Sequence, residues 1–180
     1  MGILLGFAPF IVFAVLTGLS IDLALWAALA SAFVIGIRDF AQTRLLRVLD
    51  MGSIALFGLL ALYTGFIQPS LSVPAIRLIV DGGLTTIALV SILIGNPFTL
   101  DYAREQVAKE FWHTPLFLRT NYIIAGVWVL AFGAMTAVDT AATFSARFPL
   151  TLDIAASLAV LALAVVFTTR YPAYVRDRSA

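Results

Sequence analysis

Six long apolar runs, divided by short polar segments, constrain this 180-residue chain more than any other feature. Each run approaches the roughly 20 residues that an α-helix needs to cross a bilayer. Hydrophobic residues make up 62% of the chain and charged residues only 12%, well below the share of about 25% in soluble domains. The sequence therefore predicts an all-α integral membrane protein with six transmembrane helices, at about residues 3–17, 21–37, 51–66, 75–94, 118–138 and 150–168.

The rest of the composition argues against several classes of function. The spans leave no room for a separate soluble domain, so residues 1–180 are predicted to form a single membrane domain. The net charge is only +1, and Lys and Arg occur at span ends, which argues against nucleic-acid binding. The absence of cysteine excludes disulfides, thiol catalysis and cysteine-based metal sites. The first run lacks a basic leader and a small-residue cleavage site, so we predict a retained span.

The longest polar interruption extends from Asn96 to Asn121 and holds the only histidine. Thr99 can cap a short helix there, and apolar residues recur on one helical face, namely Leu100, Ala103, Val107 and Phe111. Such a helix would lie in the membrane–water interface, with Tyr102 and Trp112 at headgroup depth. We therefore predict an interfacial amphipathic helix between helices four and five, within a cytoplasmic segment over residues 96–117.

Basic residues are divided unequally between the two sides that six spans would create. Nine lie on one side, in the connector after the second span, in the polar segment and in the C-terminal tail. The other side receives two, Arg77 and Arg147. Because an excess of Lys and Arg marks the cytoplasmic face, both termini are predicted to be cytoplasmic.

The spans also contain an internal repeat. A threonine near the end of one span precedes an aspartate early in the next by 17 residues in two places, 64 to 81 and 136 to 153, and a shorter version occurs at 17 and 22. We therefore predict three tandem αα-hairpins over about residues 3–37, 51–94 and 118–168. Parallel repeats of this kind occur in transporters, and repeats also arise in bundles that have no transport pathway.

Three early aspartates, Asp22, Asp81 and Asp153, are expected on the outer side of the membrane. One interpretation is a ring of carboxylates around a cation or proton path. The alternative, favoured for Asp22 and Asp153, is that the helix macrodipole stabilises a carboxylate in the first turn. Arg77 precedes Asp81 by one helical turn, so these two residues are predicted to form a structural ion pair.

The polar segment offers contact residues rather than catalytic ones. His113 has no partner at metal-ligand spacing and is expected to be a surface residue. Arg104, Lys109 and Arg119, together with Trp112, could bind lipid phosphate or an acidic patch of a partner, or could simply mark the cytoplasmic side. No nucleophile with its base, phosphate-binding loop or cofactor motif is found, so we predict no enzyme, no cofactor and no metal site.

Two residues of the fifth predicted span are candidates for helix packing. Asn121 and Trp128 lie seven residues apart and therefore on one stripe of a helix. An asparagine can hydrogen-bond between helices in lipid, and a tryptophan can fill the space between them.

The order of these features resembles the inner-membrane-spanning YciB family, also called intracellular septation protein A. The matching features are the Phe7-Ala8-Pro9-Phe10 motif with Phe13, the Ile21-Asp22 helix start, the basic connector, and Pro97-Phe98 followed by Trp112, Asn121, Trp128 and Phe132. The chain departs from the family in its longer polar segment at residues 101–105 and in its fewer lysines. The resemblance implies a bacterial inner-membrane protein that maintains the cell envelope through contacts with other membrane proteins.

Together these observations predict a non-enzymatic protein that acts in septation-type processes through protein or lipid contacts. Its expected partners are the lipid bilayer, including anionic lipid, and other membrane proteins or a second copy of the chain. The alternative is a small ion or solute channel or transporter that uses the outer aspartates.

Overall fold

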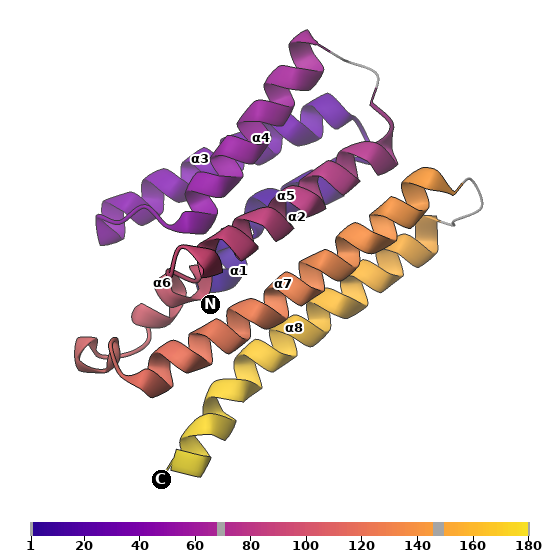
Figure 1. The fold of residues 1–180 in the computed structure, drawn as a ribbon. Coiled ribbons are helices and arrows are strands. Elements are labelled where there is room, and N and C mark those ends of the chain that lie inside the picture. The colour runs from indigo at the N-terminus through magenta and orange to yellow at the C-terminus, as the bar shows by residue number, and fades with distance from the viewer. Residues whose placement is uncertain (1, 68–70, 146–149, 180) are drawn as a thin grey trace. The chain divides into compact units, whose positions relative to one another are not determined.

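Helices joined by short turns make up most of the residues that the structure, a computed structural model, describes: 2–67, 71–145 and 150–179. No strand occurs in these ranges (Figure 1), which confirms the predicted all-α class. Arg147, one of the two basic residues assigned to the outer side, lies outside them. The elements in chain order are α1 (Gly2–Gly6), α2 (Ala8–Leu16), α3 (Ile21–Thr43), α4 (Val48–Phe66), α5 (Val73–Leu93), α6 (Phe98–Arg104), η1 (Lys109–Phe111), α7 (Pro115–Phe144) and α8 (Leu150–Ser179).

Five of the described helices are long and apolar enough to cross a membrane. They are α3, α4, α5, α7 and, within α8, Thr151–Arg176. Their lengths run from 19 to 30 residues, which covers the roughly 20 residues that a bilayer demands. The chain therefore has the helices of a multi-pass membrane protein.

The N-terminal run differs from the single helix predicted over residues 3–17. It forms two short helices, α1 and α2, that meet at Phe7. Pro9 lies at the start of α2, where its missing N–H is not needed, so the proline begins a new helix instead of continuing the first. From Gly2 to Leu16 a straight helix would measure about 22 Å, less than the ~30 Å hydrocarbon core.

The described helices form two compact units, residues 1–87 and 88–180, and the boundary falls within α5. In the first unit α3 packs against both α2 and α4. Phe57 of α4 meets two phenylalanines of α2, with its ring 5.1 Å from Phe10 and 5.8 Å from Phe13. Small residues on α3 are fully buried, which lets its neighbours approach closely, as packing in lipid requires: Ala24, Ala28 and Ala32.

Helices α4 and α5 of the first unit approach each other at two glycines. A Cβ placed on Gly52 would lie 2.8 Å from three side-chain atoms of Ile87. A Cβ on Gly83 would lie 2.5 Å from the Leu56 side chain. Each contact is closer than real Cβ atoms show. The opposing side chain fills the space that a Cβ would need, which explains why both positions are glycine.

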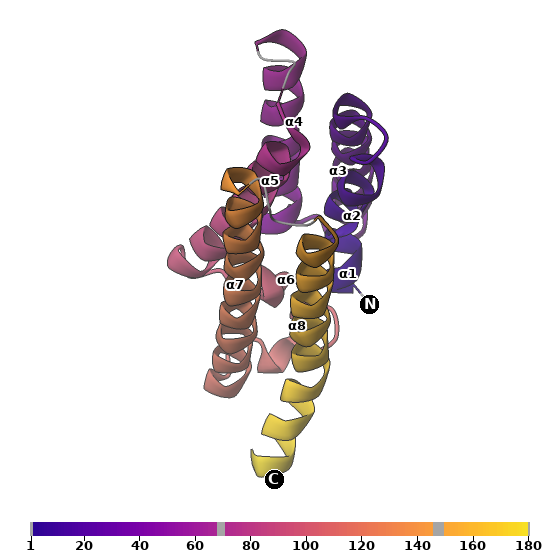
Figure 2. The same cartoon turned by 90° about the vertical axis from the view of Figure 1, so that its right-hand side faces the viewer.

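The second unit is organised around α7 and α8, which pack side by side along their length (Figures 1 and 2). Trp128 of α7 is buried, and its indole Nε1 donates a hydrogen bond to Thr168 Oγ1 of α8 at 2.9 Å. The Trp128 ring also contacts Phe132, with centroids 5.3 Å apart. This bond joins residues 40 positions apart and so defines how the two helices align.

Candidate functional site

The predicted interfacial amphipathic helix is wrong as a single element. The structure has two short pieces, α6 and η1, separated by turn and irregular residues at 105–108. Leu100 is buried inside the protein, Ala103 and Val107 are half-buried, and Phe111 is 50% exposed. The predicted apolar face therefore does not form one continuous stripe.

Local hydrogen bonds explain why α6 is packed into the second unit instead of extending along the membrane surface. Thr99, predicted as a helix cap, is buried and donates its hydroxyl to the backbone oxygen of Asn121 at 3.0 Å. Ser91 Oγ accepts the backbone N–H of Phe98 at 3.1 Å. Gly95 supplies the left-handed turn between α5 and α6, with φ of 80°. Together these contacts fix the N-terminal end of α6.

Trp112 contacts three residues that precede it in the chain, Arg104, Val107 and Lys109. Its indole Nε1 donates to the backbone oxygen of Val107 at 2.9 Å, which closes the irregular turn. The Arg104 guanidinium lies 5.8 Å from the ring centroid and the Lys109 ammonium 6.0 Å, both within cation–π range. Arg104 also pairs with Asp101 at 3.5 Å. Two of the predicted contact residues thus meet on the third.

Most exposed side chains of this region lie within residues 109–119, which we call the contact segment. Lys109, His113 and Arg119 are exposed, and the exposed apolar side chains are Phe111 at 50% and Leu116 at 44%. Thr114 caps α7 by accepting the N–H of Phe117 at 3.4 Å, and Pro115 occupies the first turn. The segment therefore presents both apolar and charged side chains beside a capped, ordered helix start.

Formal charges in the wider region cancel. Residues 98–119 carry three acids, Asp101, Glu105 and Glu110, and three bases, Arg104, Lys109 and Arg119. A polybasic lipid-binding segment carries a clear excess of Lys and Arg. The balance of charge here, with exposed apolar groups, is closer to the mixed surface of a protein–protein contact.

Asn121 and Trp128 are both buried on α7. The Asn121 side chain donates to its own helix, at Phe117 O, while its backbone oxygen receives Thr99. Trp128 makes the bond across to α8. Of this predicted pair, the tryptophan therefore supplies the side-chain bond between helices.

The aspartates of the repeat lie in different settings. Asp22 is exposed in the first turn of α3, which Ser20 caps, a position that favours the macrodipole interpretation. Arg77 and Asp81 are half-buried, one turn apart on α5. Asp153 lies early in α8 but is only 2% exposed, so water does not surround it. Asp22 and Asp81 belong to the first compact unit, and Asp153 to the second.

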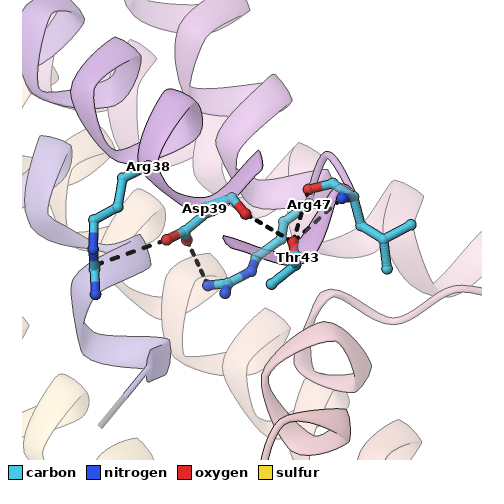
Figure 3. A network of polar contacts seen from close by, with 5 residues as sticks. Arg38, Asp39, Thr43 and Arg47 are labelled. Carbon is cyan, nitrogen blue, oxygen red and sulfur yellow. Dashed lines mark hydrogen bonds and ion pairs between the residues drawn. The ribbon is translucent and has the colours of Figure 1, made fainter. Parts of the chain in front are cut away.

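A buried ion pair at the turn from α3 to α4 was not predicted (Figure 3). Arg47 Nη1 lies 2.6 Å from Asp39 Oδ2, and the two residues are 5% and 2% exposed. Arg38 approaches the other carboxylate oxygen at 3.8 Å, and Thr43 donates to the Asp39 backbone at 2.8 Å. Arg47 is one of the basic residues in the connector after the second predicted span. The only signal for the pair is that an acid and a base flank one short turn.

Further buried acids accompany these sites in each unit. Asp50, three residues after Arg47, is buried against Gly36, whose added Cβ would lie 3.8 Å from the Asp50 Cβ. Asp139 of α7 is buried in the second unit. Counting eleven residues from the Trp128–Thr168 bond towards the α7–α8 turn places Asp139 level with Ser157. Among the described residues, no group of three or more His, Cys, Asp or Glu could hold a metal ion.

Comparisons with protein-family models, with curated proteins and with solved structures found no match to this chain. The resemblance to the septation-protein family therefore remains a prediction from the sequence.

Proposed function

We propose that this chain is a non-enzymatic membrane protein that acts by docking other membrane proteins at its contact segment, residues 109–119. One observation supports this most: half-exposed Phe111 and Leu116 stand beside Lys109 and Arg119 in a region without net charge. Aromatic and arginine side chains are enriched in protein interfaces, and mixed charges give an interface its specificity.

Local order supports the same proposal. Trp112 anchors the segment through its bond to Val107 O and through two cations on its ring. Residues that are already held in place lose less conformational entropy when a partner binds. The contact segment is therefore better suited to binding than a free loop of the same composition.

The cellular setting follows from the sequence. The resemblance implies the bacterial inner membrane and a role in the cell envelope or septation, and the distribution of basic residues supports a cytoplasmic contact segment with both termini on that side. A six-span arrangement of three hairpins requires the paired helices α1 and α2 to serve as the first span. Their packing on α3 and α4 through Phe10 and Phe13 is compatible with that role.

The proposal is tested by reversing two exposed charges in the full-length, membrane-inserted chain. Lys109→Glu with Arg119→Glu should remove the partners that wild-type protein captures from solubilised membranes after crosslinking, because both side chains are exposed. Arg104 is left intact, since it pairs with Asp101 and packs on Trp112.

Arg44→Glu is the control, because it reverses an arginine that is also exposed but lies in the other compact unit. It should leave the captured partners unchanged. Membrane insertion of all variants is checked by carbonate extraction. An identical set of captured proteins for wild type and the Lys109/Arg119 variant would refute docking at this segment.

A further inference from the structure

The last turns of α8 carry a ladder of stacked side chains on one helical face. Phe167 stacks on Tyr171, with centroids 4.8 Å apart and planes inclined by 15°, and Tyr171 continues to Tyr174 at 6.5 Å. The guanidinium of Arg178 then lies over the Tyr174 ring, 4.6 Å from its centroid. The spacing of four, three and four residues keeps all four side chains on one stripe.

Helix length places this ladder at the edge of the bilayer. α8 has 30 residues and so measures about 45 Å, while the hydrocarbon core is about 30 Å thick. Between Thr151 and Thr169 the only charged residue is Asp153, and this stretch alone is about 28 Å long. Residues from Arg170 onwards therefore extend into the headgroup region, where tyrosine and arginine are favoured.

The charge of this end is clearly positive, whereas the charges of residues 98–119 cancel. Residues 170–180 hold Arg170, Arg176 and Arg178 against one acid, Asp177. All three arginines are exposed. Nine residues before Trp128 on α7 is Arg119, and nine residues after Thr168 falls between Arg176 and Arg178. Arg119 therefore lies at the same end of the α7–α8 pair as the arginines of α8.

The geometry of Arg178 suits a phosphate ligand. A guanidinium that stacks on an aromatic ring uses its flat face and leaves the N–H donors at its edge free. Those donors match phosphate oxygens in a bidentate arrangement. Because Tyr174 already orients Arg178, binding a phosphate sacrifices less side-chain entropy.

We propose that the end of α8, from Arg170 to Arg178, binds the phosphate groups of anionic phospholipids. The arginines supply the charge, and the aromatic ladder holds Arg178 at headgroup depth. An acidic protein could meet the same charges, but the position at the end of an apolar span favours lipid. This site is separate from the contact segment and does not rest on protein docking there.

The test measures lipid binding to the purified full-length chain by native mass spectrometry in detergent. Wild-type protein should bind phosphatidylglycerol more tightly than phosphatidylcholine. Arg176→Gln with Arg178→Gln should weaken phosphatidylglycerol binding about 30-fold and leave phosphatidylcholine unchanged. Lys109→Gln is the control, because it removes a cation from the contact segment and should keep the preference.

A second pair of variants separates the ladder from net charge. Tyr174→Leu keeps every arginine but removes the ring under Arg178, so phosphatidylglycerol binding should fall severalfold. Tyr174→Phe retains the ring and should bind as wild type. Helix content by circular dichroism shows whether each variant is folded. If the double arginine variant does not fold, the comparison of Tyr174→Leu with Tyr174→Phe tests the proposal.

Two results would overturn the proposal. One is a phosphatidylglycerol preference that survives in both the double arginine and the Tyr174→Leu variants. The other is loss of a captured protein from the double arginine variant with an unchanged lipid preference, which would assign the arginines to a protein partner. If the Lys109/Arg119 variant loses its captured partners but still binds phosphatidylglycerol, the result supports protein docking at the contact segment and leaves the lipid site at the end of α8 unaffected.

Discussion

Arg47 shows that the burial and pairing of a charged residue in a membrane protein are not evident from its sequence. It lies in the basic connector that was used to predict the cytoplasmic side, yet it is buried, and its Nη1 lies 2.6 Å from Asp39 Oδ2. A charge removed from water is tolerated only when a partner and hydrogen bonds replace the lost hydration. Position in the chain indicates which side of the membrane a residue occupies, but the pairing depends on how α3 and α4 meet.

Removing one member of this buried pair should therefore destabilise the chain more than removing both. Arg47→Met leaves the Asp39 carboxylate buried without the guanidinium, and we expect a loss of about 3–5 kcal/mol in the free energy of unfolding. Asp39→Leu combined with Arg47→Met should recover most of that loss. Unfolding in mixed micelles, followed by circular dichroism, measures both values. A double variant no more stable than Arg47→Met would contradict the pairing.

At the scale of helices, the sequence predicted starts better than ends. α3 and α8 begin at the predicted residues, Ile21 and Leu150. The start of α3 carries a local signal, the Ser20 cap. α7 begins at Pro115, three residues before its predicted start at 118, because proline is favoured in the first turn of a helix. α3, α7 and α8 each extend at least six residues past their predicted ends. The first polar residues after an apolar span can mark the edge of the bilayer, but they do not end the helix. α3 stops only where Arg44 adopts a left-handed conformation.

The prediction of one interfacial helix was wrong for a different reason. Periodicity over residues 99–111 described a plausible amphipathic face, but Thr99 donates its hydroxyl to a residue 22 positions away. Tertiary hydrogen bonds of this kind override a local helical pattern, and a single sequence does not reveal them. The structure does bring together Arg104, Lys109 and Trp112, which were grouped from the sequence by residue type, and their role in partner contacts stays a prediction.

Packing between α4 and α5 makes a prediction about two glycines of one helix. Gly52→Ala would press its Cβ against three atoms of Ile87, so we expect a loss of about 1–3 kcal/mol in stability. Gly58→Ala is the matched control on α4, because its Cβ would meet only Leu29 at an ordinary 3.8 Å.

The control should be neutral, or more stable by up to about 1 kcal/mol, since alanine favours helix over glycine. Thermal denaturation in detergent distinguishes the two variants. Equal melting temperatures would show that α4 and α5 do not approach as described.

For the whole molecule, the membrane arrangement can be examined directly because the chain has no cysteine. Single cysteines at Leu45 and Lys109, both exposed, should react with an impermeant maleimide only after the cells are permeabilised, because they are expected on the cytoplasmic side. A cysteine at Ser72, which is exposed before α5, should react in intact cells. An N-terminal tag should be protected in intact cells if α1 and α2 cross the membrane.

Labelling of Leu45→Cys and Ser72→Cys from the same side would exclude the proposed orientation. A tag accessible from outside would leave the orientation of α3 to α8 unchanged but reduce the number of spans to five. The sequence alone does not decide between these counts, because Phe7 and Pro9 interrupt a run that is already short for a bilayer.

The bond between Trp128 and Thr168 also gives the molecule an optical reporter. The three tryptophans occupy distinct environments: Trp26 is half exposed on α3, Trp112 is bound to a backbone oxygen, and Trp128 is buried with its N–H bonded across the α7–α8 pair. Phenylalanine at positions 26 and 112 would leave one emitting indole. Its fluorescence and its N–H vibration would then respond to any separation of the two helices, with no attached dye.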